Sequence, residues 1–296
     1  MEQIGKLMGR RLVAGIPTLW LTGLFLVPFL IVLKLSFSEV RLAVPPYAPL
    51  LAWLHGLPIP QLHFANYAFL FTDALYVSSY LYSLKVAAVA TLCCLLIGYP
   101  MAYAVARSRP STRNVLLMLI VLPFWTSFLL RVYALEGIIR DNGLLNTVLL
   151  RLGLIEHPLQ IMRTSAAVYL GIVYSYLPFM VLPLFATLEK LDHTLVEAAA
   201  DLGSPPWRVF LDVTLPLSMP GIIAGSMLVL IPAIGEFVIP SLLGGPNNLM
   251  IGRVLWDEFF GNHDWPVASA VAIATLVLLV GPIALYQHYH LRELEG

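Results

Sequence analysis

Long stretches without a charged residue constrain this chain more than any other feature. Residues 13–33 and residues 86–106 each run for 21 residues without Asp, Glu, Lys or Arg. An α-helix rises about 1.5 Å per residue, so roughly 20 apolar residues cross a hydrocarbon core of about 30 Å. Charged residues make up only 11% of the chain, against roughly 25% in soluble domains. The sequence therefore predicts an integral membrane protein and excludes an ordinary soluble or disordered one.

Six apolar segments predict an all-α integral membrane protein with six transmembrane helices in one domain over residues 1–296. The third segment is short and is extended by flanking polar ends that reach the interface. In the fifth, Gly221 and Gly225 form a GxxxG motif, which predicts close packing of another helix there. The outer segment 38–80 is rich in proline and is expected to be an irregular cap. The six predicted spans are residues 13–33, 86–106, 115–130, 166–188, 217–235 and 266–286.

Two compact clusters of basic residues predict the orientation, because Lys and Arg in short loops favour the cytoplasmic side. One cluster lies in the N-terminal tail, and the other lies in the turn after the second predicted span. With six spans, both termini and the loop 189–216 are then expected in the cytoplasm. The formal net charge is zero, so no basic field favours nucleic acid as a partner. The two clusters consist of Lys6, Arg10, Arg11, Arg107, Arg109 and Arg113.

The inner loop predicts two short helices that meet at a glycine. Thr194 and Glu197 have the spacing of a capping box, which starts the first helix, and Gly203 ends it. Ser204 followed by Pro205 supplies a new N-cap and first-turn proline for a second short helix. Apolar residues recur on one face of the pair. Such a pair either lies in the lipid interface or fills a groove in a soluble partner.

The same loop resembles the cytoplasmic signature of the permease subunits of binding-protein-dependent ABC importers. That signature reads E-A-A, three residues, G, nine residues, a hydrophobic residue, one more, L and P. In this family the loop is the coupling helix, which inserts into a cleft on the ATPase subunit. Valine stands where isoleucine is usual. The matching residues are Glu197, Ala198, Ala199, Gly203, Val213, Leu215 and Pro216, and Asp201 lies among them.

The resemblance covers nearly the whole chain and narrows to the polyamine branch, nearest to its putrescine importers. It implies the type I ABC importer architecture in a bacterial inner membrane. The implied partners are a second homologous permease, two copies of a cytoplasmic ATPase and a periplasmic polyamine-binding protein. ATP and Mg²⁺ would be held by the ATPase, because this chain contains no G-x-x-x-x-G-K-[ST] motif. It is thus expected to bind no cofactor and to be no enzyme. The stretches that carry the resemblance are residues 96–100, 122–128, 235–240, 250–256 and 264–270.

Glu236 is the main candidate for contact with a transported cation. It follows the uncharged run 213–235, and an ionisable group at such a position is costly unless it faces protein or water. Its carboxylate would attract a diamine or triamine. The alternatives are pairing with a backbone amide or an Arg, or contact with the partner permease. Aromatic faces also attract ammonium groups, so Trp125, Tyr174 and Tyr176 are further candidates for contact with the cation. The alternative for each of them is ordinary helix packing.

Trp256, Asp257 and Glu258 are assigned to the outer mouth or to docking, since they follow the fifth span. No metal site and no catalytic residue are predicted, because the histidines lie outside the spans without a ligand spacing. Two alternatives to a polyamine importer permease stay open, both of which would involve another solute. One is a secondary transporter working alone, and the other is a membrane scaffold whose inner loop binds a soluble protein.

Overall fold

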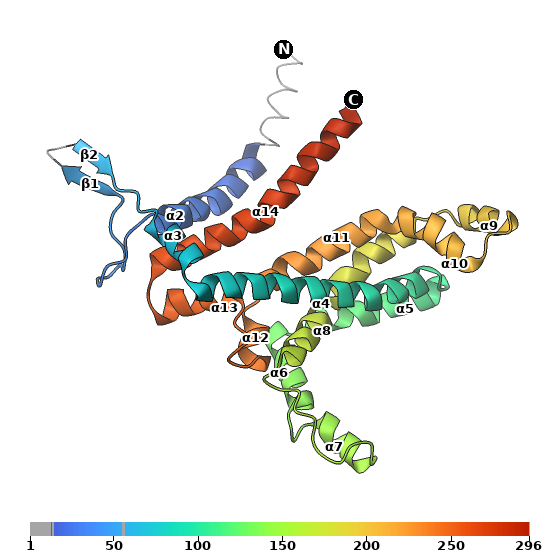
Figure 1. Ribbon diagram of the computed structural model, residues 1–296. Coiled ribbons are helices and arrows are strands. Elements are labelled where there is room, and N and C mark those ends of the chain that lie inside the picture. Colours follow the sequence, from blue (N-terminus) through green and yellow to red (C-terminus); the bar gives the residue numbers. More distant parts are fainter. Residues whose placement is uncertain (1–12, 14, 55–56, 296) are drawn as a thin grey trace. The chain divides into compact units, whose positions relative to one another are not determined.

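The computed structural model describes Val13, residues 15–54 and residues 57–295, and Figure 1 shows their course. The chain divides into two compact units, Met1–Val77 with Leu255–Gly296 and Ser78–Val254. The prediction of a single permease domain stays a prediction. The described helices are η1 (Thr22–Leu26), α2 (Val27–Ser36), α3 (Ala65–Thr72), α4 (Ala74–Ala106), α5 (Pro110–Val121), η2 (Leu122–Trp125), α6 (Phe128–Ile139), α7 (Leu144–Arg151), α8 (Ser165–Leu188), α9 (His193–Asp201), α10 (Pro206–Val209), η3 (Phe210–Thr214), α11 (Leu215–Ile234), α12 (Val238–Leu243), α13 (Ile251–Trp256), η4 (Asp257–Gly261) and α14 (Trp265–Glu295).

The outer segment departs from the predicted irregular cap. Strands β1 (Leu51–Leu54) and β2 (Leu57–Pro60) pair antiparallel, with Leu51 opposite Pro60. Proline is tolerated here because each strand of a two-stranded sheet keeps one free edge. The small helix α3 follows, and α4 already begins at Ala74. The fold is therefore helical with one small hairpin, and the irregular part of the segment is shorter than expected.

Four helices among the described residues are long and apolar enough to cross a membrane. They are Gly15–Ser36, Ala74–Ala106, Ser165–Leu188 and Pro206–Ile234. They overlap the first, second, fourth and fifth predicted spans over nearly their whole length. The sixth predicted span lies in α14, whose apolar part Trp265–Val280 falls below that length. The chain is a multi-pass membrane protein, and the number six stays a prediction. The tail with Lys6, Arg10 and Arg11 lies outside the described residues.

The third predicted span, residues 115–130, is wrong as one continuous helix. The helical segments Pro110–Trp125 and Phe128–Arg151 are bent against each other by 96° and would together make a fifth span. Pro123 lacks an N–H, so it disfavours continuation of an α-helix through η2. The Thr126 hydroxyl then donates to the Pro123 carbonyl over 2.7 Å, and Thr126 itself is extended. Local bonds of this kind compete with the helical ladder.

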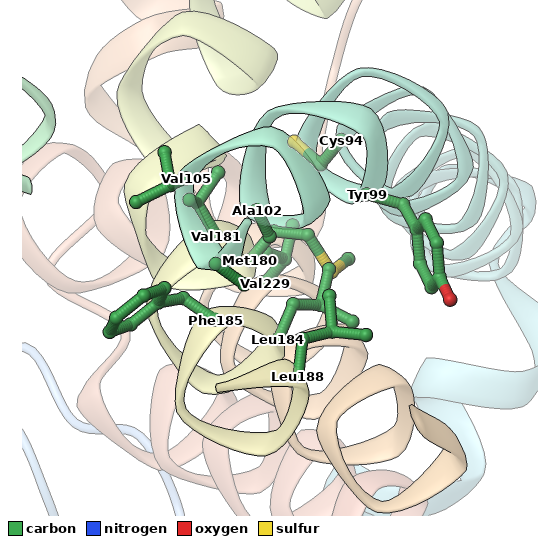
Figure 2. Packing of buried hydrophobic residues seen from close by; sticks show 11 residues of the cluster. Cys94, Tyr99, Ala102, Val105, Met180, Val181, Leu184, Phe185, Leu188 and Val229 are labelled. Atoms are coloured by element: carbon green, nitrogen blue, oxygen red, sulfur yellow. The ribbon is translucent and has the colours of Figure 1, made fainter. Parts of the chain in front are cut away.

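The apolar core of unit Ser78–Val254 lies between α4, α8 and α11. Figure 2 shows side chains from α4 and α8 meeting there, together with Val229 from α11. Gly221 and Gly225 bring α11 onto α8: a Cβ at Gly225 would lie 3.0 Å from the Met180 carbonyl oxygen, and one at Gly221 would lie 2.9 Å from the Thr187 Cβ. The predicted role of the GxxxG motif in close packing is confirmed.

Replacing Gly225 by leucine is expected to destabilise the chain by about 1–3 kcal/mol, because the added atoms meet the α8 backbone in a packed core. The midpoint of thermal unfolding of the purified chain in detergent measures this. Gly137→Leu is the matched control, since a Cβ at this glycine of α6 meets nothing within 4 Å. Equal midpoints for the two variants would contradict the packing role.

The other unit packs α14 against α2 and α3. The Asn66 side-chain amide donates to the Ser36 and Ser38 carbonyls over 2.9 and 2.8 Å. The Tyr67 hydroxyl donates to the Ser36 hydroxyl over 2.7 Å. The carbonyls at the end of a helix have no partner within the helix, so these bonds from α3 satisfy the last turn of α2 and hold the two helices together.

Candidate functional site

The inner loop begins with α9, whose N-cap is Asp192. The Asp192 carboxylate accepts the backbone N–H of Thr194 over 3.0 Å. The predicted capping box of Thr194 and Glu197 is therefore wrong: aspartate is one of the strongest N-caps, and it starts the helix two residues earlier. Glu197, Ala198 and Asp201 are exposed.

The end of α9 follows the predicted pattern. Gly203 adopts a φ of +84°, a backbone conformation that glycine reaches without steric cost. Its N–H donates to the Ala200 carbonyl over 2.9 Å, and the Ser204 N–H donates to the Ala199 carbonyl over 3.2 Å. Both bonds satisfy carbonyls at the helix end. The prediction that Gly203 ends the first helix is confirmed.

The second short helix does not stand alone. It starts at Pro206 instead of Ser204-Pro205 and runs through the π-helical turn η3 into α11. The ring of Pro216 in a regular helix would meet the carbonyl four residues earlier, that of Asp212. The π turn over Phe210–Thr214 changes the hydrogen-bond spacing at this point. The Leu215-Pro216 part of the signature therefore lies in the first turn of a membrane-spanning helix.

The loop leaves its apolar side chains uncovered. Leu195, Leu202 and Trp207 are 48%, 88% and 61% exposed. Val196 and Glu197 instead line a cavity of about 320 Å³ together with Ala106, Arg107 and Arg113. The basic turn after α4 and the loop thus lie at the same end of this unit (Figure 1). That the loop docks on an ATPase subunit stays a prediction.

The loop is attached to the helices by contacts that the sequence did not indicate. Arg113 donates from Nη1 to the Glu189 carboxylate over 2.6 Å and from Nη2 to the Ala106 carbonyl over 3.1 Å. The Tyr99 hydroxyl lies 3.0 Å from the Ser218 hydroxyl, and the Tyr99 ring meets Phe210 edge to face at 5.6 Å. These contacts join α4, α5, the C-terminal end of α8, η3 and α11. The two ends of the loop are thus held against α5 and α4, by the Arg113–Glu189 pair and by the Tyr99–Phe210 ring contact.

Glu236 lies between α11 and α12 and is 7% exposed. Its Oε1 accepts the N–H groups of Phe237, Val238 and Ile239 over 3.2, 2.9 and 3.3 Å. Its Oε2 accepts the Tyr176 hydroxyl over 2.5 Å. The amides at a helix N-terminus stabilise a negative charge, so the carboxylate has the backbone-amide partner that the sequence left open as an alternative. Of the sequence candidates, these contacts bring Tyr176 to Glu236.

A row of aromatic rings runs from Tyr176. Tyr176 lies 5.9 Å from Phe179, and Phe179 lies 4.9 Å from Phe124. Arg131 follows, with its Cζ 5.3 Å from the centre of the Phe124 ring. Phe124, Phe179 and Arg131 were not among the candidates, although a charge directly after an apolar segment was a usable signal for Arg131.

The other two aromatic candidates lie away from this row. Trp125 is 84% exposed. Tyr174 lines a different, apolar cavity of about 450 Å³ beside Met101, Leu116 and Pro123. In the described part of the chain, neither Trp125 nor Tyr174 contacts Glu236. No contact therefore places them on one substrate path with Glu236. Their role in such a path stays a prediction.

Trp256, Asp257 and Glu258 stand where α13 passes into η4. Glu258 accepts the Tyr76 hydroxyl over 2.7 Å and the Asn262 side-chain amide over 2.9 Å. Nearby, burial raises the pKa of the Asp264 carboxyl, partly offset by its bond from the Val267 N–H. Glu258 thus joins the start of α4 to η4 within its unit. The assignment of the three residues to an outer mouth stays a prediction.

The class of the protein follows from comparison with known families. Residues 94–292 match the family described as "Binding-protein-dependent transport system inner membrane component". This match includes the loop after α8 and the helices that carry it. The chain belongs to this family and is the permease subunit of an ABC importer.

Curated relatives point to one branch of the family. The chain is 43% identical over 267 residues to the "Spermidine/putrescine transport system permease protein PotB" of Haemophilus influenzae, covering 90% of this chain and 89% of that protein. It is 46% identical over 209 residues to the protein of the same name from Escherichia coli K12, covering 71% and 76%. The resemblance to polyamine permeases is confirmed.

Solved structures with the same fold are importer permeases. A bacterial ABC transporter for import of the acidic polysaccharide alginate matches with a TM-score of 0.69 at 17% identity, over 98% of this chain and 99% of that one. The methionine ABC transporter MetNI, in an inward-facing conformation, matches with a TM-score of 0.53 at 19% identity, over 75% and 95%. At these identities the match establishes the fold, and it confirms the predicted importer permease architecture.

Proposed function

We propose that this chain is the inner-membrane permease subunit of an ATP-driven polyamine importer and forms half of its translocation pathway. The observation that carries the proposal is the 43% identity to a spermidine/putrescine permease across nine tenths of both chains. A buried carboxylate with an aromatic partner, Glu236 with Tyr176, supplies chemistry that suits an ammonium group.

In this proposal the chain works beside a second homologous permease, two copies of a cytoplasmic ATPase and a periplasmic polyamine-binding protein. Both termini lie in the cytoplasm. ATP and Mg²⁺ are held by the ATPase, and this chain binds neither. The exposed side chains Leu195, Leu202 and Trp207 fill the cleft of the ATPase. Closure of the ATPases moves the loop, and its base on α4, α8 and α11 converts that movement into rocking of the helices.

Uptake of radiolabelled putrescine tests the proposal, in cells that lack the chain and in the same cells with the chain restored. Uptake should return with the chain, and competition by excess spermidine tells whether both polyamines are carried. Equal uptake in the two kinds of cell would rule out putrescine as the substrate. Purification of the complex tests the class: an ATPase should come with the chain and turn over faster when loaded binding protein is added. A secondary transporter or a scaffold would bring no such ATPase.

A further inference from the structure

Arg131 is a buried cation without an anion among the described residues. It is 9% exposed, and its Nε is buried and has no hydrogen-bond partner there. Val132 and Ile139 of α6 are buried as well, and α6 packs on α8 and α12. A charged side chain buried between helices is costly unless it serves a function or has a partner. If position 131 served only to pack α6 against its neighbours, an apolar residue would suffice there.

The partners of Arg131 are two ring faces. Its Cζ lies 5.3 Å from the centre of the Phe124 ring and 5.8 Å from that of Phe128. Aromatic faces attract guanidinium and ammonium groups by the same electrostatic force. The faces that Arg131 occupies are therefore sites that the ammonium group of a polyamine would otherwise take.

Arg131 and Glu236 stand at opposite ends of the aromatic row. From Arg131 the contacts run over Phe124, Phe179 and Tyr176 to the Glu236 carboxylate. A buried positive side chain and a buried negative side chain thus bracket three rings. Charges act over longer distances in such surroundings than in solution.

We propose that Arg131 determines how tightly the permease holds its substrate: its guanidinium covers the faces of Phe124 and Phe128 and repels a second ammonium group, while Glu236 and Tyr176 receive the first. The proposal rests on the proposed polyamine transport. A transport site must bind its ion well enough to admit it and weakly enough to release it. Arg131 makes the binding weak enough for release.

The test is the kinetics of radiolabelled putrescine uptake with Arg131→Gln. Loss of the charge frees the ring faces, so KM should fall about tenfold, which corresponds to about 1.4 kcal/mol and lies between the values for an exposed and a desolvated cation–π contact. The maximal rate per inserted chain should also fall, because release slows. Arg131→Lys keeps the charge and should keep both values near those of the original chain.

Arg140→Gln is the matched control. It removes the same charge directly after α6, where the side chain is exposed and paired with Glu136, and both kinetic values should stay unchanged. KM does not depend on the amount of protein, so the test holds even where Arg131→Gln inserts poorly. An unchanged or raised KM in Arg131→Gln overturns the inference, as does a lysine variant that behaves like the glutamine variant. Lack of uptake by the original chain overturns the proposed function itself.

Discussion

Replacing Gly203 by aspartate is expected to abolish polyamine uptake while the chain still inserts in the membrane. The site has room, since a Cβ at Gly203 meets nothing within 4 Å. Its φ of +84° is one that aspartate tolerates better than most residues. The folding cost is therefore about 1 kcal/mol. The new carboxylate, however, lies between α9 and α10, on the surface proposed to enter the ATPase.

An unpaired charge at the centre of an interface costs about 2 kcal/mol or more, and uptake should drop by roughly 30-fold or more. Uptake, the amount of chain in the membrane and co-purification of the ATPase measure the effect. Gly153→Asp is the matched control, because Gly153 has a φ of +68° and equally open space but lies after α7. Normal uptake with Gly203→Asp, or an equal loss with Gly153→Asp, would show that docking at Gly203 is not the cause.

Replacing Glu236 by glutamine is expected to lower putrescine uptake by about tenfold or more. A hydrogen bond or contact that involves a charged group contributes about 1.5–3 kcal/mol, and glutamine lacks the charge that attracts an ammonium group. Glutamine keeps a side-chain oxygen for the N–H groups of Val238 and Ile239, so α12 should stay capped. The initial rate of uptake at low substrate concentration measures the loss.

Glu236→Ala separates attraction of the cation from capping of the helix. Alanine loses both, so the chain should also lose stability, by about 1 kcal/mol for the missing cap. Glu136→Gln serves as control, because it makes the same change in the pair with Arg140. Normal uptake with glutamine and lost uptake with alanine would mean that Glu236 serves only as a helix cap.

The apolar spans and the inner loop were predictable because their signals are local. An uncharged, apolar run of about 20 residues has the length of a membrane-spanning helix, and four such predictions match long helices. The end of α9 at Gly203 also followed from one residue. The third span failed because residues 122–127 decide between a straight and a broken helix through local bonds, such as that of Thr126 to the Pro123 carbonyl.

Helix boundaries in the inner loop depended on competition between neighbours. Asp192 and Thr194 are both good N-caps, and the spacing to Glu197 favoured the second, whereas the structure uses the first. Pro205 and Pro206 likewise permit two starts for the next helix, and the structure uses Pro206. Choices of this kind are small differences in energy that the surrounding packing decides.

The sequence by itself determined a membrane-spanning helical chain with the coupling signature of an importer permease, because apolar length and local motifs carry that information. Only the tertiary structure decided what the buried charges contact. Glu236 and Tyr176 are 60 residues apart and form a hydrogen bond, while Arg131 meets Phe124 after the chain bends by 96°. A charge in the membrane takes its partner from whichever helices pack around it, and that packing is a property of the whole fold.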